Sequence, residues 1–337
     1  MKDFRSALRI ALLGSVIFAH FATADGLSEY RALIGYDIRS SDSDSTDIET
    51  QNLRGQLFLS AVNTRNNYPM ELQEYFNRSS SIYLNRAVVN QTAGIDINSR
   101  YSGKGLTLAS PASPFVFSWS KSEMNNADVD VEVNFSRPQD AMADQSIEIK
   151  SLGIYIDEFF VRFSRTENDS MLKYKYDQRQ DNIWSSPLKI NHYYLQVDTG
   201  TTSDELAVMY TDSIVGGAYF SVGMAIIFTD INEDISNLRY DSLFSIPQDY
   251  ADFPGTLQEK ASIRQTSDEE TWRYFAAWYP NRYSYLKTEY SRGRNQGIAL
   301  RGGAYLTYRM SVYASFVHGS GSHNPAKVTM AGLEYLF

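Results

Sequence analysis

The amino-acid sequence predicts an all-β protein, a transmembrane antiparallel up-and-down β-barrel of about 16 strands, with 14 and 18 as the neighbouring counts. Three observations support this fold class. Apolar and polar residues alternate with a period of two along most of the chain, and the nine prolines fall between or at the ends of the alternating runs. Aromatic residues reach 14% although the mean hydropathy is −0.37. A sheet between lipid and water is both aromatic and polar, because half of its residues face each solvent. Composition alone also fits a soluble β-sandwich or propeller.

The first 24 residues predict an export signal. Lys2, Arg5 and Arg9 precede an apolar run at 10–19, and the small residues of 22–24 follow it. This order is typical of a secretory signal, cleaved near Ala24. The apolar run is shorter than the roughly 20 residues that a membrane-spanning helix needs. A buried N-terminal helix is the alternative interpretation.

We expect residues 25–337 to form a single barrel domain, because no second long apolar run and no internal repeat follows. Removal of the signal takes away a net charge of +2, so the formal charge moves from −9 to −11. This acidic balance disfavours nucleic acid as a partner. The sequence has no cysteine, so an exported form must derive its stability from burial or from its solvent rather than from disulfides.

The connections between the expected strands are of two kinds. Tight joints are expected at 279–283 and 308–310, and longer polar loops at 39–51 and 318–327. Short turns on one side and longer loops on the other are typical of a transmembrane barrel.

Two stretches depart from the alternating pattern. MELQEYF, at Met70 to Phe76, is the one short helix candidate. Residues 230–256 fit either one long loop or a loop, a strand and a turn.

The C-terminal stretch VTMAGLEYLF predicts a barrel-closing strand. Leu333, Tyr335 and Phe337 lie on one face of an extended chain, and Glu334 lies on the other. This ending resembles the closing strand of Gram-negative outer-membrane β-barrels, and YLTYRMSVYASFVHG resembles a barrel hairpin with a short periplasmic turn. The chain length is similar to that of general porins, although the inward-loop motif Pro-Glu-Phe-Gly-Gly of such porins is absent from the sequence.

The resemblance implies a location and a set of partners. The expected location is the outer membrane of a Gram-negative bacterium. The expected partners are outer-membrane lipid and lipopolysaccharide, the barrel assembly machinery, small hydrophilic solutes and, as in many porins of this size, two further copies in a homotrimer. The expected function is passive diffusion of small hydrophilic solutes or ions, without a cofactor.

If the apolar strand faces meet lipid, the charged positions opposite them line the lumen. Charged side chains on the lipid face cost about 2–4 kcal/mol at the midplane for Arg or Lys, so the lumen is favoured. Basic and acidic rings set the ion preference of a pore. The competing interpretation is a solvated inner face, or ion pairs that fill the interior. The predicted pore-lining residues are Lys260, Arg264, Arg273, Lys287, Arg301, Asp128, Asp130 and Glu132.

Two other classes of protein remain open. An outer-membrane hydrolase needs a nucleophile next to a base, and HGSGSH at 318–323 is the nearest approach, but it lacks Gly-x-Ser-x-Gly. We therefore expect no enzyme activity.

The acidic run Asp42, Asp44, Asp47 lacks the glycine and glutamate of a calcium loop, so no metal site is expected. The main alternative is a non-conducting barrel that acts as a scaffold, receptor or adhesin, which an open or filled lumen would distinguish.

Overall fold

The computed structural model describes the chain from Glu29 to the C-terminus, with several connections left out. The described residues are 29–43, 46–65, 68–92, 95–124, 128–131, 138–180, 189–214, 217–242, 256–293, 295–321 and 327–337. The predicted signal segment 1–24 lies outside them.

Fifteen strands and two short helical segments make up the described fold. In chain order they are β1 (Glu29–Ser43), β2 (Thr46–Asn63), η2 (Met70–Leu72), α2 (Gln73–Asn77), β3 (Ser81–Thr92), β4 (Ile95–Ala109), β5 (Phe115–Met124), β6 (Asp128–Val131), β7 (Pro138–Ile156), β8 (Phe159–Gln180), β9 (Lys189–Ile214), β10 (Ala218–Ser242), β11 (Thr256–Asn281), β12 (Ser284–Arg292), β13 (Asn295–Tyr305), β14 (Met310–Gly321) and β15 (Lys327–Leu336).

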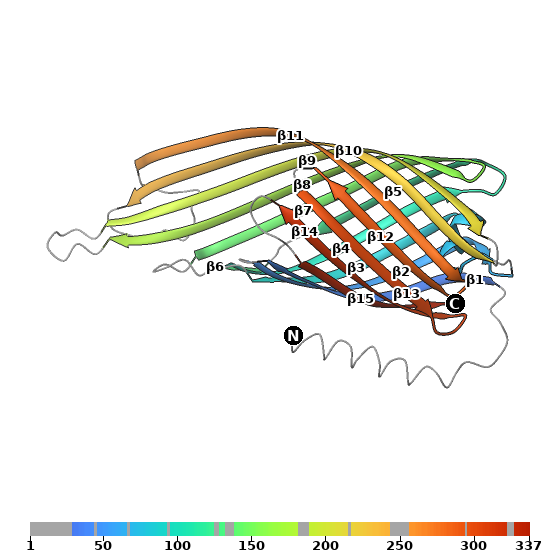
Figure 1. Cartoon of the computed structure of the whole chain (residues 1–337). Coiled ribbons are helices and arrows are strands. Elements are labelled where there is room, and N and C mark those ends of the chain that lie inside the picture. The colour runs from blue at the N-terminus through green and yellow to red at the C-terminus, as the bar shows by residue number, and fades with distance from the viewer. Residues whose placement is uncertain are drawn as a thin grey trace.

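The strands form one closed antiparallel barrel (Figure 1). The last strand, β15, pairs with β1, and β3 pairs with β4. The described sheet is therefore closed, without an unpaired edge strand. Both β5 and the short β6 pair with β4, through Tyr101↔Met124 and Asn98↔Asp128, so β6 continues the line of β5. The barrel therefore has 14 strand positions, a count within the predicted range.

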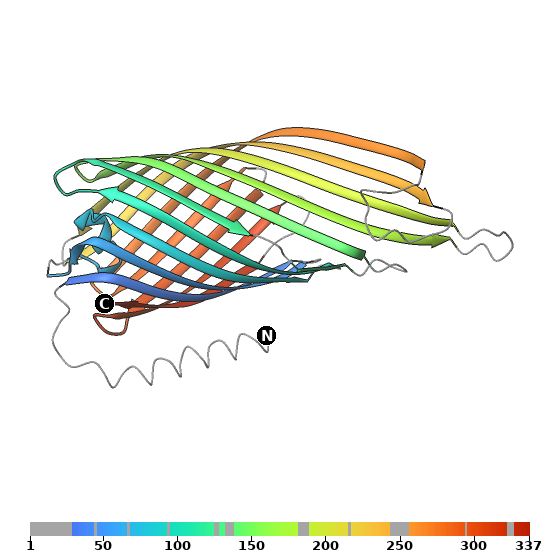
Figure 2. The same cartoon turned by 180° about the vertical axis from the view of Figure 1, so that it is seen from behind.

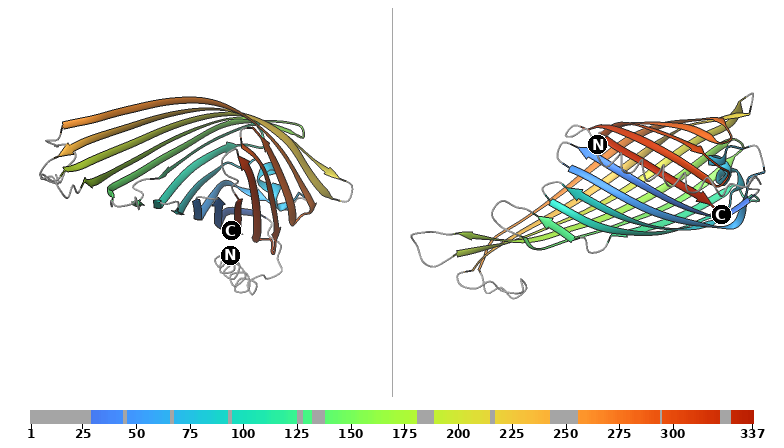
Figure 3. Two further views of the ribbon diagram at one scale, coloured as in Figure 1. Left: turned by 60° about the vertical axis from the view of Figure 1, so that its left-hand side comes forward. Right: turned by 90° about the horizontal axis from the view of Figure 1, so that it is seen from below.

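The wall of the barrel is uneven in height. Strands β8 to β11 are 22 to 26 residues long, whereas β12 to β15 have 9 to 12 residues. The long strands consequently project well beyond the rest of the barrel, as Figures 2 and 3 show. Part of the ambiguous stretch 230–256 belongs to this wall: β10 runs to Ser242 instead of ending in a loop at residue 230. The isoleucines at 231 and 235 lie on the inward face with Ala225, so the outward apolar face of β10 does not continue into this part of the strand.

The two ends of the barrel differ in their connections. The tight joints predicted at 279–283 and 308–310 both lie at the end that holds the C-terminus, where Leu306 N–H donates to Met310 O. Asp157 turns the chain between β7 and β8 at this same end with a positive φ of 52°. We call it the turn end and the opposite one the loop end.

Side chains alternate between an apolar outer face and a polar interior. On β10, Val222, Met224 and Phe228 are 43%, 42% and 52% exposed, whereas Ala225 is 3% exposed. The same alternation places Leu333, Tyr335 and Phe337 outside, and Glu334 and Leu336 inside. Leu336 packs with Tyr30, Phe58 and Val62 in a small apolar cluster at the turn end. This is the arrangement expected of a strand between lipid and a polar lumen.

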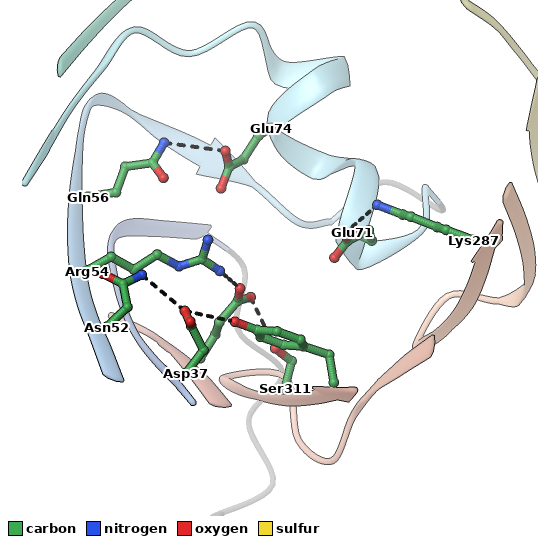
Figure 4. A network of polar contacts seen from close by, with 10 residues as sticks. Asp37, Asn52, Arg54, Gln56, Glu71, Glu74, Lys287 and Ser311 are labelled. Carbon is green, nitrogen blue, oxygen red and sulfur yellow. Dashed lines mark hydrogen bonds and ion pairs between the residues drawn. The ribbon is translucent and has the colours of Figure 1, made fainter. Parts of the chain in front are cut away.

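The connection between β2 and β3 folds into the barrel instead of forming a turn. We call residues 64–80, without the undescribed 66–67, the inward segment. It contains η2 and α2, where the sequence predicted a short helix, and α2 ends at Arg78 in the left-handed conformation. Figure 4 shows this helical segment inside the barrel wall at the turn end.

Candidate functional site

The inward segment is attached to the hairpin formed by β11 and β12. Met70 N–H donates to Arg282 O at 2.8 Å, and the Arg282 guanidinium donates back to Thr64 O. The Lys287 ammonium, from β12, forms an ion pair of 2.6 Å with Glu71 (Figure 4). One backbone hydrogen bond, one hydrogen bond from a side chain to the backbone and one ion pair therefore fix this side of the segment.

Aromatic contacts hold its other side against β7 and β8. The Tyr75 ring lies 5.0 Å from the Tyr155 ring and 6.1 Å from the Phe160 ring, in edge-to-face arrangements. The Arg78 guanidinium carbon lies 4.1 Å from the centre of the Tyr155 ring. Such contacts are each worth about 0.5–1.5 kcal/mol beyond their burial. The segment thus connects the β11–β12 hairpin with β7 and β8, across the two strands that lie between them in the wall.

A polar network lies beside the segment, on β1, β2, β14 and β15. Glu334 accepts from the Arg54 guanidinium and, at 3.2 Å, from the Ser311 hydroxyl. Asp37 accepts from Asn52 at 3.2 Å and from the Tyr313 hydroxyl at 3.4 Å. Figure 4 shows these groups converging from neighbouring strands. Because the network crosses the β1–β15 junction, it links the first and last strands as well as lining the interior.

Glu74 lies between the helix and β2. Its carboxylate accepts from Gln56 Nε2 at 3.4 Å. Burial raises the pKa of Glu74 to about 7, and the nearby Glu71 carboxylate adds to the effect, while the Gln56 hydrogen bond and Arg54 oppose it. Protein surrounds the Glu74 side chain, and the part of it that remains accessible lines the adjoining cavity.

A second set of interior charges lies along the inner side of the barrel wall, from β8 to β12. Glu205 pairs with Arg162 at 2.6 Å and with Arg273 at 3.4 Å, and Arg273 also pairs with Glu289 at 3.1 Å. The strands between these groups present buried alanines, Ala207 and Ala225, to the interior. Small residues at these positions leave room for both arginines to reach Glu205. We call these four charged residues the interior ladder.

The structure brings three of the predicted pore-lining residues to the interior. Arg273 belongs to the ladder, and Lys287 and Arg301 are direct neighbours in the β12–β13 register. The structure does not place Arg264 on the same face as these three residues, which corrects the prediction. Arg264 precedes Arg273 by an odd number of positions in β11, and the pairing with β10 shows no register shift between the two, so their side chains point to opposite faces. Asp128 and Asp130 lie in β6 and Lys260 lies in β11, without described side chains, and Glu132 is outside the described residues. A role in permeation remains a prediction for all of them.

Sequence reasoning missed the residues at the turn end. Arg54 and Glu334 face each other across the closing strands, a contact that no local pattern could reveal. Glu71 and Glu74 lie in the predicted helix MELQEYF, and their spacing of three places both on one side of it. The sequence therefore indicated the short helix that carries both carboxylates, but not that this helix folds into the barrel.

The features considered for other classes lie apart from this site. His318 is in β14, and His323 is outside the described residues. In the described part of the chain, no group of three or more histidine, cysteine or acidic residues is arranged to hold a metal ion. No described helix is both long and apolar enough to cross a membrane.

Comparisons with known proteins support the fold. No family model and no curated protein matches the chain. Among solved structures, the deltaS2 mutant of the TodX monoaromatic hydrocarbon channel matches with a TM-score of 0.50 at 9% identity. The match covers 93% of this chain and 90% of the TodX chain. The outer membrane protein Omp33 of Acinetobacter baumannii has a TM-score of 0.46 at 11% identity, with coverages of 92% and 99%. The toluene transporter TodX of Pseudomonas putida has a TM-score of 0.48 at 9% identity, with coverages of 94% and 90%.

Fold and interior together define a class of structure: a closed antiparallel β-barrel with an apolar outer face, a charged interior and a segment folded inward at one end. At these identities the likeness to solved barrels concerns the fold alone. The likeness is shared across most of both chains.

Proposed function

We propose that this protein is an outer-membrane channel of a Gram-negative bacterium that lets small hydrophilic solutes or ions diffuse passively, without a cofactor or a covalent step. The observation that carries the proposal is the interior ladder. Four charged side chains face inward from β8, β9, β11 and β12, while the outer face of the same strands is apolar. Charged side chains that line the inner wall of a pore select solutes by charge as well as by size.

The apolar outer face supports the membrane location. Exposed rings on it include Phe159, Trp278 and Phe337. Aromatic side chains on the outside of a barrel are typical of lipid interfaces. In this proposal the turn end faces the periplasm, lipid and lipopolysaccharide surround the wall, and the barrel assembly machinery inserts it. A homotrimer is the proposed assembly.

Conductance across a planar bilayer tests the channel function. The purified protein is expected to give discrete current steps, and Arg273→Ala is expected to shift the ion preference toward cations because a lumenal positive charge is lost. The control is Arg165→Ala. Arg165 also lies near two carboxylates, Glu167 and Asp204, but it faces outward on β8. An equal effect of both substitutions, or no change in either, would contradict the assignment of the ladder to the pore.

A non-conducting barrel that serves as a scaffold, receptor or adhesin is the second candidate. The inward segment favours it, because contacts on several sides hold a folded element inside the lumen. Deletion of residues 68–78 with a short glycine linker separates the two candidates. Current that increases on deletion supports a channel narrowed by the segment. A protein without current before and after deletion supports the non-conducting barrel.

A further inference from the structure

A cavity of about 210 Å³ lies between the inward segment and the barrel wall. Its lining is mostly polar, and its charged groups come from β2 (Arg54), β13 (Arg301), β15 (Glu334) and the segment itself (Glu71 and Glu74). Drug-sized ligands occupy pockets of about 300–1,000 Å³, so this cavity fits a smaller solute.

Most of the charged groups in the cavity already have partners. Arg54 pairs with Glu334, and Glu71 pairs with Lys287. Two groups of opposite sign remain. Among the side chains that the structure describes, Arg301 has no carboxylate within 4.0 Å and Glu74 has no basic group within that distance.

The unpaired guanidinium of Arg301 is held in place by two tyrosines. Its central carbon lies 4.4 Å from the centre of the Tyr313 ring, and the Tyr285 hydroxyl is within hydrogen-bonding reach. The Nε atom of Arg301 is buried without a hydrogen-bond partner. The two rings lie close against the sheet because glycines are next to them: a Cβ atom would overlap the Tyr313 ring at Gly332 and the Tyr285 ring at Gly303. Glu71 acts on this cation only at longer range, because its ion pair is with Lys287, so no described carboxylate contacts the Arg301 guanidinium directly.

The unpaired carboxyl of Glu74 is held by Gln56. The charged and titratable groups around it come from four elements: Glu71 from η2, Arg54 from β2, Tyr30 from β1 and Tyr305 from β13. The nearest cation, Arg54, is occupied by Glu334. Arg54 acts on Glu74 only at longer range, so a bound ammonium group would give the ionised Glu74 carboxylate the direct cationic partner that it lacks.

We propose that the cavity binds a small zwitterion, an α-amino acid, with its carboxylate on Arg301 and its ammonium group on Glu74. A ligand with a single charge compensates only one of the two groups, whereas a zwitterion compensates both and brings no net charge into a partly buried space. This inference rests on the proposed channel function, because the solute reaches the cavity from the lumen.

Binding of L-alanine to the purified protein in detergent, measured by isothermal titration calorimetry, tests the proposal. L-alanine is expected to bind at least about tenfold more tightly than acetate or ethylammonium, since each of these lacks one charge-assisted hydrogen-bonding group. Arg301→Gln and Glu74→Gln are each expected to weaken alanine binding about tenfold or more. Arg165→Gln, on the outer face, is expected to leave it unchanged. Heat-dependent gel mobility confirms that each variant forms a barrel.

The remaining outcomes separate this inference from the channel function. Equal binding of acetate and alanine, alanine binding that survives both interior substitutions, or no alanine binding at all would overturn the zwitterion site. Glycine betaine, which has no N–H donors, is expected to bind more weakly than alanine, and equal binding would overturn the role of Glu74 as acceptor. A protein that conducts ions but does not bind alanine retains the channel function. One that binds alanine without conducting retains the site and loses the channel.

Discussion

Lys287 in the barrel wall and Glu71 in the inward segment form an ion pair of 2.6 Å between residues 216 positions apart in the chain. The pair is partly screened from solvent, since the side chains of Glu71 and Lys287 are 17% and 34% exposed. The wall and the segment are therefore mechanically connected at a point inside the barrel. Several measurable consequences follow from this attachment and from the contacts around it.

Loss of the pair is expected to loosen the segment. Lys287→Met should weaken its docking by about 1.5–3 kcal/mol, the usual value of a hydrogen bond to a charged group. The buried Ser79, at the end of the segment, provides a reporter: the sequence has no cysteine, so Ser79→Cys adds a single thiol. Labelling of this thiol by a charged reagent should accelerate in Lys287→Met. Lys150→Met is the control, because Lys150 pairs with Glu148 on the outer face. Unchanged labelling in Lys287→Met would show that the ion pair does not hold the segment.

The docking of the segment is expected to depend on pH through Glu74. The pKa of this carboxyl is about 7 in the folded protein, above its ordinary value of 4.5, so the docked form favours the protonated acid. The stabilisation is fully present below pH 4.5 and is lost as the pH rises through about 7. Labelling of Ser79→Cys, divided by that of the exposed Ala112→Cys, should therefore increase between about pH 5 and pH 8. In a Glu74→Gln background the ratio should stay level, and an equal increase there would assign the effect to another group.

Gly332 is expected to be intolerant of a side chain. A Cβ atom at this position would overlap the Tyr313 ring, so Gly332→Ala must displace that ring. The expected loss in the free energy of unfolding is about 1–3 kcal/mol, measured by urea denaturation in lipid vesicles. Gly55→Ala is the matched control, because nothing lies within 4 Å of the place that its Cβ atom would occupy. Equal stability of the two variants would mean that the close ring contact is dispensable.

Leu336 is expected to contribute more to stability than an outward leucine. It is 2% exposed and packs in the apolar cluster at the turn end, whereas Leu57 is 54% exposed on the outer face. Leu336→Ala should cost about 2–5 kcal/mol, as for other buried leucines, and Leu57→Ala clearly less. The same urea unfolding experiment compares them. A similar cost for both would indicate that the interior cluster is not tightly packed.

Local patterns predicted much of the wall. Alternation and proline placement indicate strands because the side-chain period of a strand is two, a property that each segment carries by itself. The tight joints near Arg282 and Arg309, and the short helix at MELQEYF, were predicted because their signals are also local to the segment. The strand count was less certain, since residues 230–242 are too polar to display an apolar face even though they continue β10.

The partners of the interior charges could not be predicted in the same way. The prediction placed Arg264 on the same face as Arg273, Lys287 and Arg301. Arg264 and Arg273 are an odd number of positions apart in β11, without a register shift between them, so their side chains point to opposite faces. Contacts such as Arg54 with Glu334 depend on barrel closure, and the pairing of Glu205 with both arginines depends on which strands become neighbours.

By itself, then, the sequence determined an alternating, sheet-rich chain with an apolar face, a charged face and an aromatic C-terminal strand. These properties arise between residues a few positions apart. Only the tertiary structure decided that 14 strand positions close the barrel, that the inward segment folds into it, and that Arg301 and Glu74 share a cavity without sharing a partner. The physical reason is that closure and inward folding bring together groups more than two hundred residues apart, whose distances no local period encodes.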